Sequence, residues 1–272
     1  MFISKINGRK PDQVQALVVR AAGTNCDQET IHALTQAGAA CELAHVNQIL
    51  SGRTRLHPYQ IVVFPGGFSY GDDIAAGKVL ANELRLRLKD QLARFVEGKK
   101  LVIGVCNGFQ VLVKAGLLPG FTPIDAEQSA TLTLNDSGRF QCEWVAIATE
   151  KSAASWLDGM PPSFELPIAH GEGKFLTASP AVLTKLKKNR QIVFRYDKNN
   201  PNGSEAAIAG VCNVGGNVVG LMPHPERFVS RYQHPNWPLW SSASGEFGDG
   251  FWFWEKAVGY ARNLLKGTVP AK

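Results

Sequence analysis

One cysteine of this 272-residue sequence lies where a strand pattern changes into a helix pattern. The residues from Leu101 to Val105 form a short, β-branched apolar run of the length of a buried strand. From Asn107 a compact apolar helical segment follows and ends at Gly116. Cys106 therefore occupies a sharp strand-to-helix turn. A helix N-terminus aimed at a thiol favours the reactive thiolate and offers N–H groups to an oxyanion.

Two glycines support this interpretation of the turn. Gly104 and Gly108 lie two residues before and two residues after Cys106. Glycine has no Cβ, so both positions allow the backbone to pack closely around a strained turn. The pattern predicts a nucleophilic cysteine, and the alternative is a buried structural cysteine, which is the commoner role of a free thiol.

A thiol nucleophile needs a base and a group that orients the base. Of the six histidines, His224 alone follows a strong apolar strand and lies between two prolines. Prolines favour extended backbone, in which side chains two residues apart point to the same side. Glu226 is therefore expected to point to the same side of the chain as His224. The alternative for His-x-Glu is an ordinary surface dipeptide. Cys106, His224 and Glu226 together predict a Cys-His-Glu triad.

A third motif, Pro65-Gly66-Gly67, follows another apolar run. Backbone without side chains can approach a reacting carbonyl, so Gly66 and Gly67 suit an oxyanion hole. The alternative is a phosphate cradle, but the spacing of these glycines matches neither the P-loop nor the dinucleotide fingerprint. No spacing of histidine, cysteine and carboxylate residues indicates a metal site.

The elements expected to position these motifs alternate between strand and helix in the first half of the chain. Alternation of this kind predicts a parallel sheet with helices on its faces. In such sheets the active-site residues lie at the carboxyl ends of the strands. A long helix is expected from about Gly77 to Glu97, because its leucines recur every four residues. The predicted strands are 14–20, 40–46, 61–64 and 101–105, and the first helix is 27–37.

The second half of the chain has a different pattern, with short apolar segments separated by turns. Short apolar segments at 130–134 and 140–148 flank Asn135-Asp136-Ser137-Gly138, which predicts a hairpin-type turn. Further strands are expected at 191–196, 206–212 and 218–222, followed by a closing helix at 251–265. The prediction is an α/β fold with a mostly parallel sheet and an additional antiparallel or mixed section. With no repeat or linker, residues 14–265 form one predicted domain after a lead-in at 1–13.

Composition narrows the class of protein. The hydrophobic fraction of 44%, the charged fraction of 19% and the net charge of +6 are ordinary for a globular chain. The one dense basic run, 185–190, is expected to be a solvated helix face rather than a nucleic-acid patch. Five cysteines without a Cys-x-x-Cys pair indicate free thiols and a reducing compartment. Without a membrane span or a signal peptide, the expected location is the cytoplasm.

The three motifs together resemble the class I glutamine amidotransferases, which have a flavodoxin-like fold. Pro65-Gly66-Gly67, the stretch from Gly104 to Gln110, and Pro223-His224-Pro225-Glu226 carry this resemblance in order and spacing. Within that class, the chain is similar to the glutaminase components of phosphoribosylformylglycinamidine synthases. Four stretches support the narrower resemblance: 23–27, 64–73, 106–110 and Pro167-Ile-Ala-His-Gly-Glu-Gly173.

The resemblance implies a role for each matching residue. Cys106 would attack the side-chain amide of glutamine, His224 would move the proton, and Glu226 would orient His224. The oxyanion and glutamine-binding positions would be Gly66, Gly67, Asn107, Gln110, His170 and Gly171. Ammonia would pass to a separate synthetase subunit, and a small third subunit would be a further candidate partner. The synthetase would use ATP and Mg²⁺ to convert formylglycinamide ribonucleotide to its amidine. No cofactor is expected in this chain.

Two alternatives remain at this point. A cysteine hydrolase or peptidase of the same superfold commonly has a histidine directly after the cysteine, whereas Asn107 follows Cys106 here. A non-catalytic binding subunit would lack a triad member. One departure concerns the segment 227–250, rich in Trp and Phe, which resembles the glutaminase domain of the large single-chain synthases more than a separate subunit. Its aromatics are expected either to pack on their own domain or to be covered by the synthetase.

Overall fold

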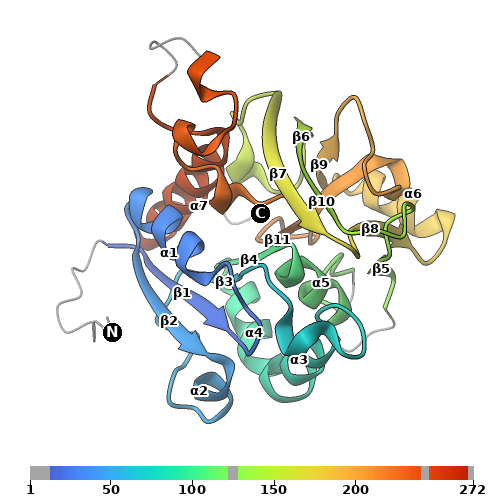
Figure 1. The fold of residues 1–272 in the computed structure, drawn as a ribbon. Coiled ribbons are helices and arrows are strands. Elements are labelled where there is room, and N and C mark those ends of the chain that lie inside the picture. The colour runs from blue at the N-terminus through green and yellow to red at the C-terminus, as the bar shows by residue number, and fades with distance from the viewer. Residues whose placement is uncertain (1–12, 122–127, 240–244, 269–272) are drawn as a thin grey trace.

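A computed structural model describes residues 13–121, 128–239 and 245–268. The main feature is a nine-stranded sheet in the order β2-β1-β3-β4-β11-β10-β9-β6-β7 (Figure 1). Five neighbouring strands run parallel: β2 (Ala40–His45), β1 (Gln15–Arg20), β3 (Ile61–Phe64), β4 (Leu101–Val105) and β11 (Val218–Leu221). The α/β fold with a mostly parallel sheet is therefore confirmed.

The remaining strands extend this sheet in antiparallel fashion. They are β10 (Ile208–Cys212), β9 (Ile192–Tyr196), β6 (Gln141–Thr149) and β7 (Ser163–His170). A separate two-stranded ribbon pairs β5 (Ala130–Thr133) with β8 (Lys174–Thr177). The additional antiparallel section predicted for the second half thus shares the main sheet rather than stacking on it.

Helices cover both faces of the main sheet (Figure 1). On one face α1 (Asp27–Gln36) packs against the C-terminal helix α7 (Asp249–Leu265). On the other face α5 (Asn107–Lys114) contacts β3, β4 and β11 and packs against α3 (Lys78–Glu83). The other helices are α2 (Val46–Leu50), α4 (Lys89–Glu97) and α6 (Pro180–Lys188), which carries most of the basic run as a largely solvated helix.

The long helix expected from about Gly77 to Glu97 is divided. A π-helical turn, Leu84–Leu88, lies between α3 and α4. A repeat of four residues drifts around a helix that has 3.6 residues per turn, and a wider turn corrects that drift. The result is that Leu80, Leu84, Leu88 and Leu92 are all buried.

The hairpin predicted at Asn135–Gly138 is wrong. The turn itself is present, since the Gly138 N–H donates to the Asn135 carbonyl at 2.9 Å. However, β5 pairs with β8, whereas β6 pairs with β7 and β9. Asn135 instead holds the loop after β7, donating to the His170 carbonyl at 2.9 Å and accepting from the Gly173 N–H at 3.0 Å.

Two further points concern the N-terminal lead-in predicted at 1–13 and the length of the apolar helices. The predicted lead-in lies outside the described residues apart from residue 13. Among the residues that the structure describes, no helix is both long and apolar enough to cross a membrane.

Candidate active site

Three predicted motifs follow three adjacent strands of the sheet. The Pro65-Gly66-Gly67 motif follows β3, Cys106 follows β4, and the segment containing His224 follows β11. The strands β3, β4 and β11 are parallel neighbours, so their carboxyl ends lie at the same edge. The topology therefore brings together residues that are far apart in the sequence, as the parallel-sheet interpretation predicts.

Cys106 lies on the sharp turn that the sequence predicts. Its φ of 50° is in the left-handed region that non-glycine residues rarely adopt, and α5 begins at the next residue. The glycines beside it are required, because a Cβ at Gly104 would lie 2.6 Å from the Gly108 carbonyl oxygen and a Cβ at Gly108 only 1.8 Å from that of Phe64. Close backbone packing thus holds the cysteine in a strained conformation at the head of a helix.

His224 and Glu226 form a buried pair. Nδ1 of His224 lies 2.6 Å from Oε1 of Glu226, and each residue is only 1% exposed. The intervening chain is a 3-10 turn, Pro225–Arg227, so the extended conformation expected there is wrong although the predicted contact forms. The turn begins at His224 and brings the Glu226 side chain back toward the ring.

The electrostatics of this pair favour an imidazolium. Burial alone would lower the pKa of His224, but the charges of Glu226 and Cys106 and hydrogen bonding to both cysteines nearby, Cys106 and Cys26, raise it well above its usual value. Since Glu226 and Cys26 both lie at Nδ1, Nε2 is the ring nitrogen left for the Cys106 thiol. The thiol itself points to the Ala169 carbonyl at 3.7 Å. The structure therefore brings the three predicted triad residues together.

A small cavity opens beside Cys106. Its volume is about 170 Å³, well below the ~300 Å³ at which pockets for drug-sized ligands begin, so it suits a molecule of amino-acid size. Larger hollows elsewhere, of about 560 and 500 Å³, contain none of the triad residues. The lining residues are Gly67, Phe68, Asp72, Ala76, Cys106, Gln110, Leu134, Phe140, Ala169, His170, Gly171 and Glu172.

The two glycines of the predicted oxyanion hole occupy different places. Gly67 lines the cavity and has a φ of 144°, and a Cβ there would lie 2.6 Å from the Gly23 carbonyl oxygen. Gly66 lies against the His224 ring, where a Cβ would lie 2.8 Å from Cε1. Asn107 begins α5, so its backbone N–H belongs to the first turn, where N–H groups lack helical partners.

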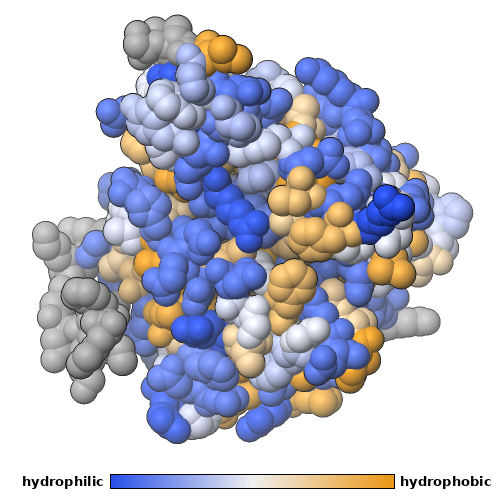
Figure 2. Space-filling view, in the orientation of Figure 1, coloured by the Kyte–Doolittle hydropathy of each residue, from blue (hydrophilic) through white to orange (hydrophobic). Residues whose placement is uncertain are grey.

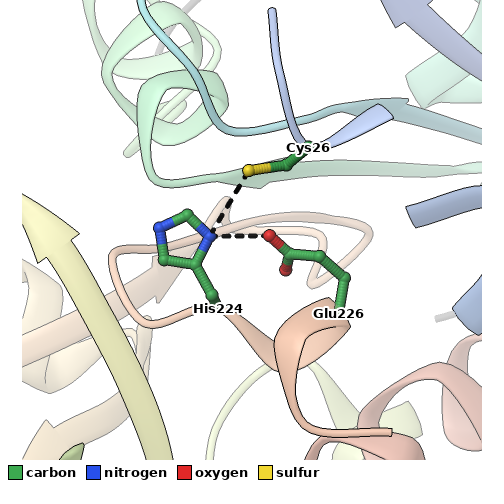
Figure 3. A group of neighbouring side chains, drawn as sticks. All are labelled: Cys26, His224 and Glu226. Atoms are coloured by element: carbon green, nitrogen blue, oxygen red, sulfur yellow. Dashed lines mark hydrogen bonds and ion pairs between the residues drawn. The ribbon is translucent and has the colours of Figure 1, made fainter. Parts of the chain in front are cut away.

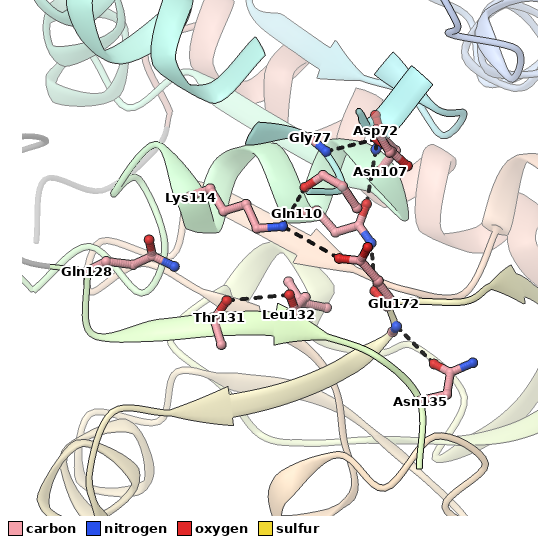
Figure 4. A network of polar contacts seen from close by, with 12 residues as sticks. Asp72, Gly77, Asn107, Gln110, Lys114, Gln128, Thr131, Leu132, Asn135 and Glu172 are labelled. Atoms are coloured by element: carbon pink, nitrogen blue, oxygen red, sulfur yellow. Dashed lines mark hydrogen bonds and ion pairs between the residues drawn. The ribbon is translucent and has the colours of Figure 1, made fainter. Parts of the chain in front are cut away.

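Of the predicted glutamine-binding residues, Gln110, His170 and Gly171 form one wall of the cavity, and Asn107 joins Gln110 in a polar network (Figure 4). Gln110 donates to the Glu172 carbonyl at 2.6 Å and accepts from the Asn107 side chain at 3.0 Å. Nδ1 of His170 lies 3.1 Å from Oδ1 of Asn135, and burial, with the charge of His224, lowers the pKa of His170 to about 4. His170 is therefore a neutral imidazole at neutral pH.

Two carboxylates in this wall were not assigned a role from the sequence. Asp72 accepts from the Gly77 N–H at 3.0 Å and from Asn107 Nδ2 at 3.1 Å, and Glu172 lies 3.8 Å from Nζ of the buried Lys114 (Figure 4). Burial raises the pKa of Asp72, and the charge of Glu172 adds to this effect. Both residues fall inside motifs quoted above, but only the cavity shows that they share one wall.

A second missed feature is Cys26, which lies against His224 with Arg227 beside it. The Cys26 Sγ, the His224 ring and a Glu226 oxygen offer ligand atoms within 4.8 Å of one another (Figure 3). Such a set could hold a thiophilic cation. In this structure, however, Nδ1 of His224 and Oε1 of Glu226 are hydrogen-bonded to each other, and Arg227 donates from Nη2 to the Cys26 sulfur at 3.0 Å. The guanidinium of Arg227 therefore provides the positive charge that a bound cation would bring to the thiol.

Comparisons with known proteins agree with this geometry. A family model described as a CobB/CobQ-like glutamine amidotransferase domain matches residues 13–261. The PurQ subunit of phosphoribosylformylglycinamidine synthase from Dehalococcoides mccartyi is 45% identical over 262 residues, covering 93% of this chain and 99% of that protein. The same subunit from Treponema denticola is 43% identical over 238 residues, covering 79% and 88%.

A solved structure, that of PurLQS from Thermotoga maritima, contains a chain that matches with a TM-score of 0.71 and 33% identity over 91% of this chain and 99% of that one. The D. mccartyi relative is a separate subunit that aligns over nearly its full length, so the segment 227–250 does not by itself indicate a fused synthase. The chain belongs to the glutamine amidotransferases, in the family of the PurQ subunits of phosphoribosylformylglycinamidine synthase.

Proposed function

We propose that this chain releases ammonia from glutamine, as the glutaminase subunit of phosphoribosylformylglycinamidine synthase in purine biosynthesis. The observation that carries the proposal is the strained Cys106 in the lining of an amino-acid-sized cavity, with the buried His224–Glu226 pair beside it. The free cysteines are in keeping with a cytoplasmic location.

The chemistry follows from the positions of these groups. The Cys106 thiolate attacks the amide carbon of glutamine, and the negative charge moves to the amide oxygen, which the N–H groups of Gly67 and Asn107 would bind. The imidazolium of His224 gives its proton to the departing ammonia and leaves a glutamyl thioester. Neutral His224 then takes a proton from water as that water attacks the thioester, which releases glutamate and the Cys106 thiol.

Asp72 and Glu172 would recognise the amino-acid end of glutamine. They line the cavity with Cys106 and Gln110, and Lys114 lies behind Glu172 rather than in the lining. A substrate ammonium beside the two carboxylates would offset the burial that raises the pKa of Asp72. This arrangement favours a free α-amino acid over an amide inside a peptide chain, and so argues against the peptidase alternative.

The synthetase and a small third subunit are the proposed partners, and the PurLQS assembly of the T. maritima relative supports both. Apolar side chains are exposed beside the cavity, at Phe68, Leu134 and Phe140. Figure 2, drawn in the orientation of Figure 1, shows apolar surface near the end of β7 and over α5. A partner that covers this face would receive ammonia directly from the cavity.

The aromatic segment 227–250 divides into two kinds of residue. Phe228 is fully buried and packs edge-on against Trp144, with ring centroids 5.0 Å apart. Tyr232 and Trp237 pack on each other at 5.2 Å but remain 59% and 41% exposed. Trp240 lies outside the described residues. Phe228 therefore stabilises the fold, and we propose that Tyr232 and Trp237 contact the synthetase.

Replacing the nucleophile should separate the two half-reactions. Cys106→Ala should lower glutamine-dependent synthesis by about 10³-fold or more, because no other thiol lines the cavity. The assembled complex should still use added ammonium salts at the wild-type rate. Glutamine turnover by the variant near the wild-type rate would refute Cys106 as the nucleophile.

Asp72→Asn should raise the KM for glutamine by roughly 10-fold or more, the value of one lost charge-assisted hydrogen bond, with a smaller change in kcat. Asparagine keeps an oxygen for the Gly77 and Asn107 donors, so the wall should persist. Asp73→Asn, at the exposed neighbouring position, is the matched control. Equal KM values for Asp72→Asn and the wild type would remove Asp72 from glutamine binding.

Glu226→Gln, made in a Cys106→Ala background, should lower stability in a pH-dependent way. The folded pKa of His224 is raised above its unfolded value of about 6.5. The stability from its charge is therefore fully present below that pH and is lost as the pH rises through the raised pKa.

Removal of the Glu226 charge should thus lower the free energy of unfolding most near pH 6 and least at high pH, as measured by urea denaturation. The pH dependence should disappear when His224→Asn is added. A stability loss of the same size at every pH would show that the pair acts only as a neutral hydrogen bond.

Trp237→Ala should weaken binding of the synthetase, by up to a few kcal/mol if the ring lies at the centre of the interface, without lowering the melting temperature of the isolated chain. Ammonia release, which we expect to be slow without the synthetase, should then need more synthetase for full activation. Phe228→Ala is the contrasting variant and should lower the melting temperature, since that ring is buried. A large fall in melting temperature for Trp237→Ala with unchanged affinity would make the exposed pair structural.

A further inference from the structure

Cys26 is a buried thiol that the proposed chemistry does not use. It is 0% exposed and lies directly before α1, at the end of the loop that follows β1. It is absent from the lining of the glutamine cavity, so it does not contact the substrate there. Its side chain makes no capping hydrogen bond to α1, which leaves its sulfur for contacts in another direction.

The sulfur donates to Oδ1 of Asn25 at 3.1 Å, and its other contacts are with His224 and Arg227. Sγ of Cys26 lies 4.0 Å from Nδ1 of His224, on the same nitrogen that bonds to Glu226 (Figure 3). Arg227, the residue after Glu226, donates from Nη2 to the same sulfur at 3.0 Å. Burial alone would lower the pKa of Arg227, but the interactions with Cys26, Glu226 and Cys106 together outweigh this effect and raise it.

Cys26 also joins the base to the proposed oxyanion loop. The N–H groups of Asn25 and Cys26 both donate to the Gly66 carbonyl, at 3.3 and 3.2 Å. A Cβ on Gly66 would lie 3.1 Å from the Cys26 sulfur and 2.8 Å from Cε1 of His224. The sulfur, the ring and the glycine backbone therefore fill one space with no room for another group.

We propose that Cys26 is a positioning residue for the catalytic base, held in place by Arg227. This inference rests on the proposed glutaminase function. The thiol occupies the space beside Nδ1 and packs against the ring, so that Nδ1 stays bonded to Glu226 and Nε2 remains directed to Cys106. The same residue ties the ring to the loop that carries Gly67.

Cys26→Ala and Cys26→Ser test this role in the complex with the synthetase. For Cys26→Ala we expect a 10- to 100-fold fall in kcat, roughly the cost of misplacing a catalytic group, with the KM for glutamine within about two-fold of wild type. Serine is small and can still accept from Arg227, so it should restore much of the loss. Cys212→Ala is the matched control, because Cys212 is equally buried but lies on β10.

A second readout does not depend on glutamine. The rate at which iodoacetamide alkylates Cys106, followed by peptide mass mapping across pH, reports the pairing of the thiol with His224. Because Cys26 helps to raise the pKa of His224, Cys26→Ala should move the midpoint of this profile to higher pH, and Cys212→Ala should not. If wild-type complex released no ammonia from glutamine, the proposed function would fail while this measurement still tested Cys26.

Arg227→Gln provides an independent variant should Cys26→Ala fold poorly, and it should shift the alkylation profile in the same direction. Combined with Cys26→Ala, its effect on kcat should be less than additive, because the two residues act as one unit. An unchanged kcat for Cys26→Ala would overturn the proposal. So would a loss of activity that follows the melting temperature, as in Cys212→Ala, with an unchanged alkylation profile.

Discussion

The buried hydrogen bond between His224 and Glu226 is the constraint to which the rest of the site is fitted. Its 2.6 Å length and the 1% exposure of both residues mean that two ionisable groups are held away from water. Loss of one partner from such a pair leaves an unpaired buried charge and costs about 3–5 kcal/mol. The surrounding structure must therefore keep the ring and the carboxylate together in a single arrangement, and the glycine at 66 and the sulfur at 26 leave the ring no space to turn.

Close packing also fixes the turn at Cys106. Backbone atoms of β3, β4 and α5 approach so closely that no side chain fits at Gly104 or Gly108. The contacts are between main chains, whose positions vary less than those of side chains, so the turn at Cys106 is held by the sheet itself. This explains how a φ of 50° persists at a non-glycine residue.

Much of this arrangement could be predicted from local pattern. The strands β3 and β4 have the residue ranges expected from their apolar runs. Cys106, His224 and Glu226, which were chosen from the turns around them, lie together in the structure. Features that depend on distant partners were not predicted. The turn at Asn135 has the sequence of a hairpin, but its side chain bonds to the loop after β7 instead. Cys26 and Asp72 acquire their importance only from neighbours that no sequence spacing brings near.

The position of β11 has a consequence for synthesis of the protein. This strand lies between β4 and β10, although it is the last strand among the described residues. Until it leaves the ribosome, β4 is an open edge, and the antiparallel half of the sheet has nothing to join. Long-range strand pairing of this kind is slow compared with local folding. His224 follows this strand, so the nascent chain exposes the turn at Cys106 before His224 can reach it, and the candidate active site forms only when the sheet is complete.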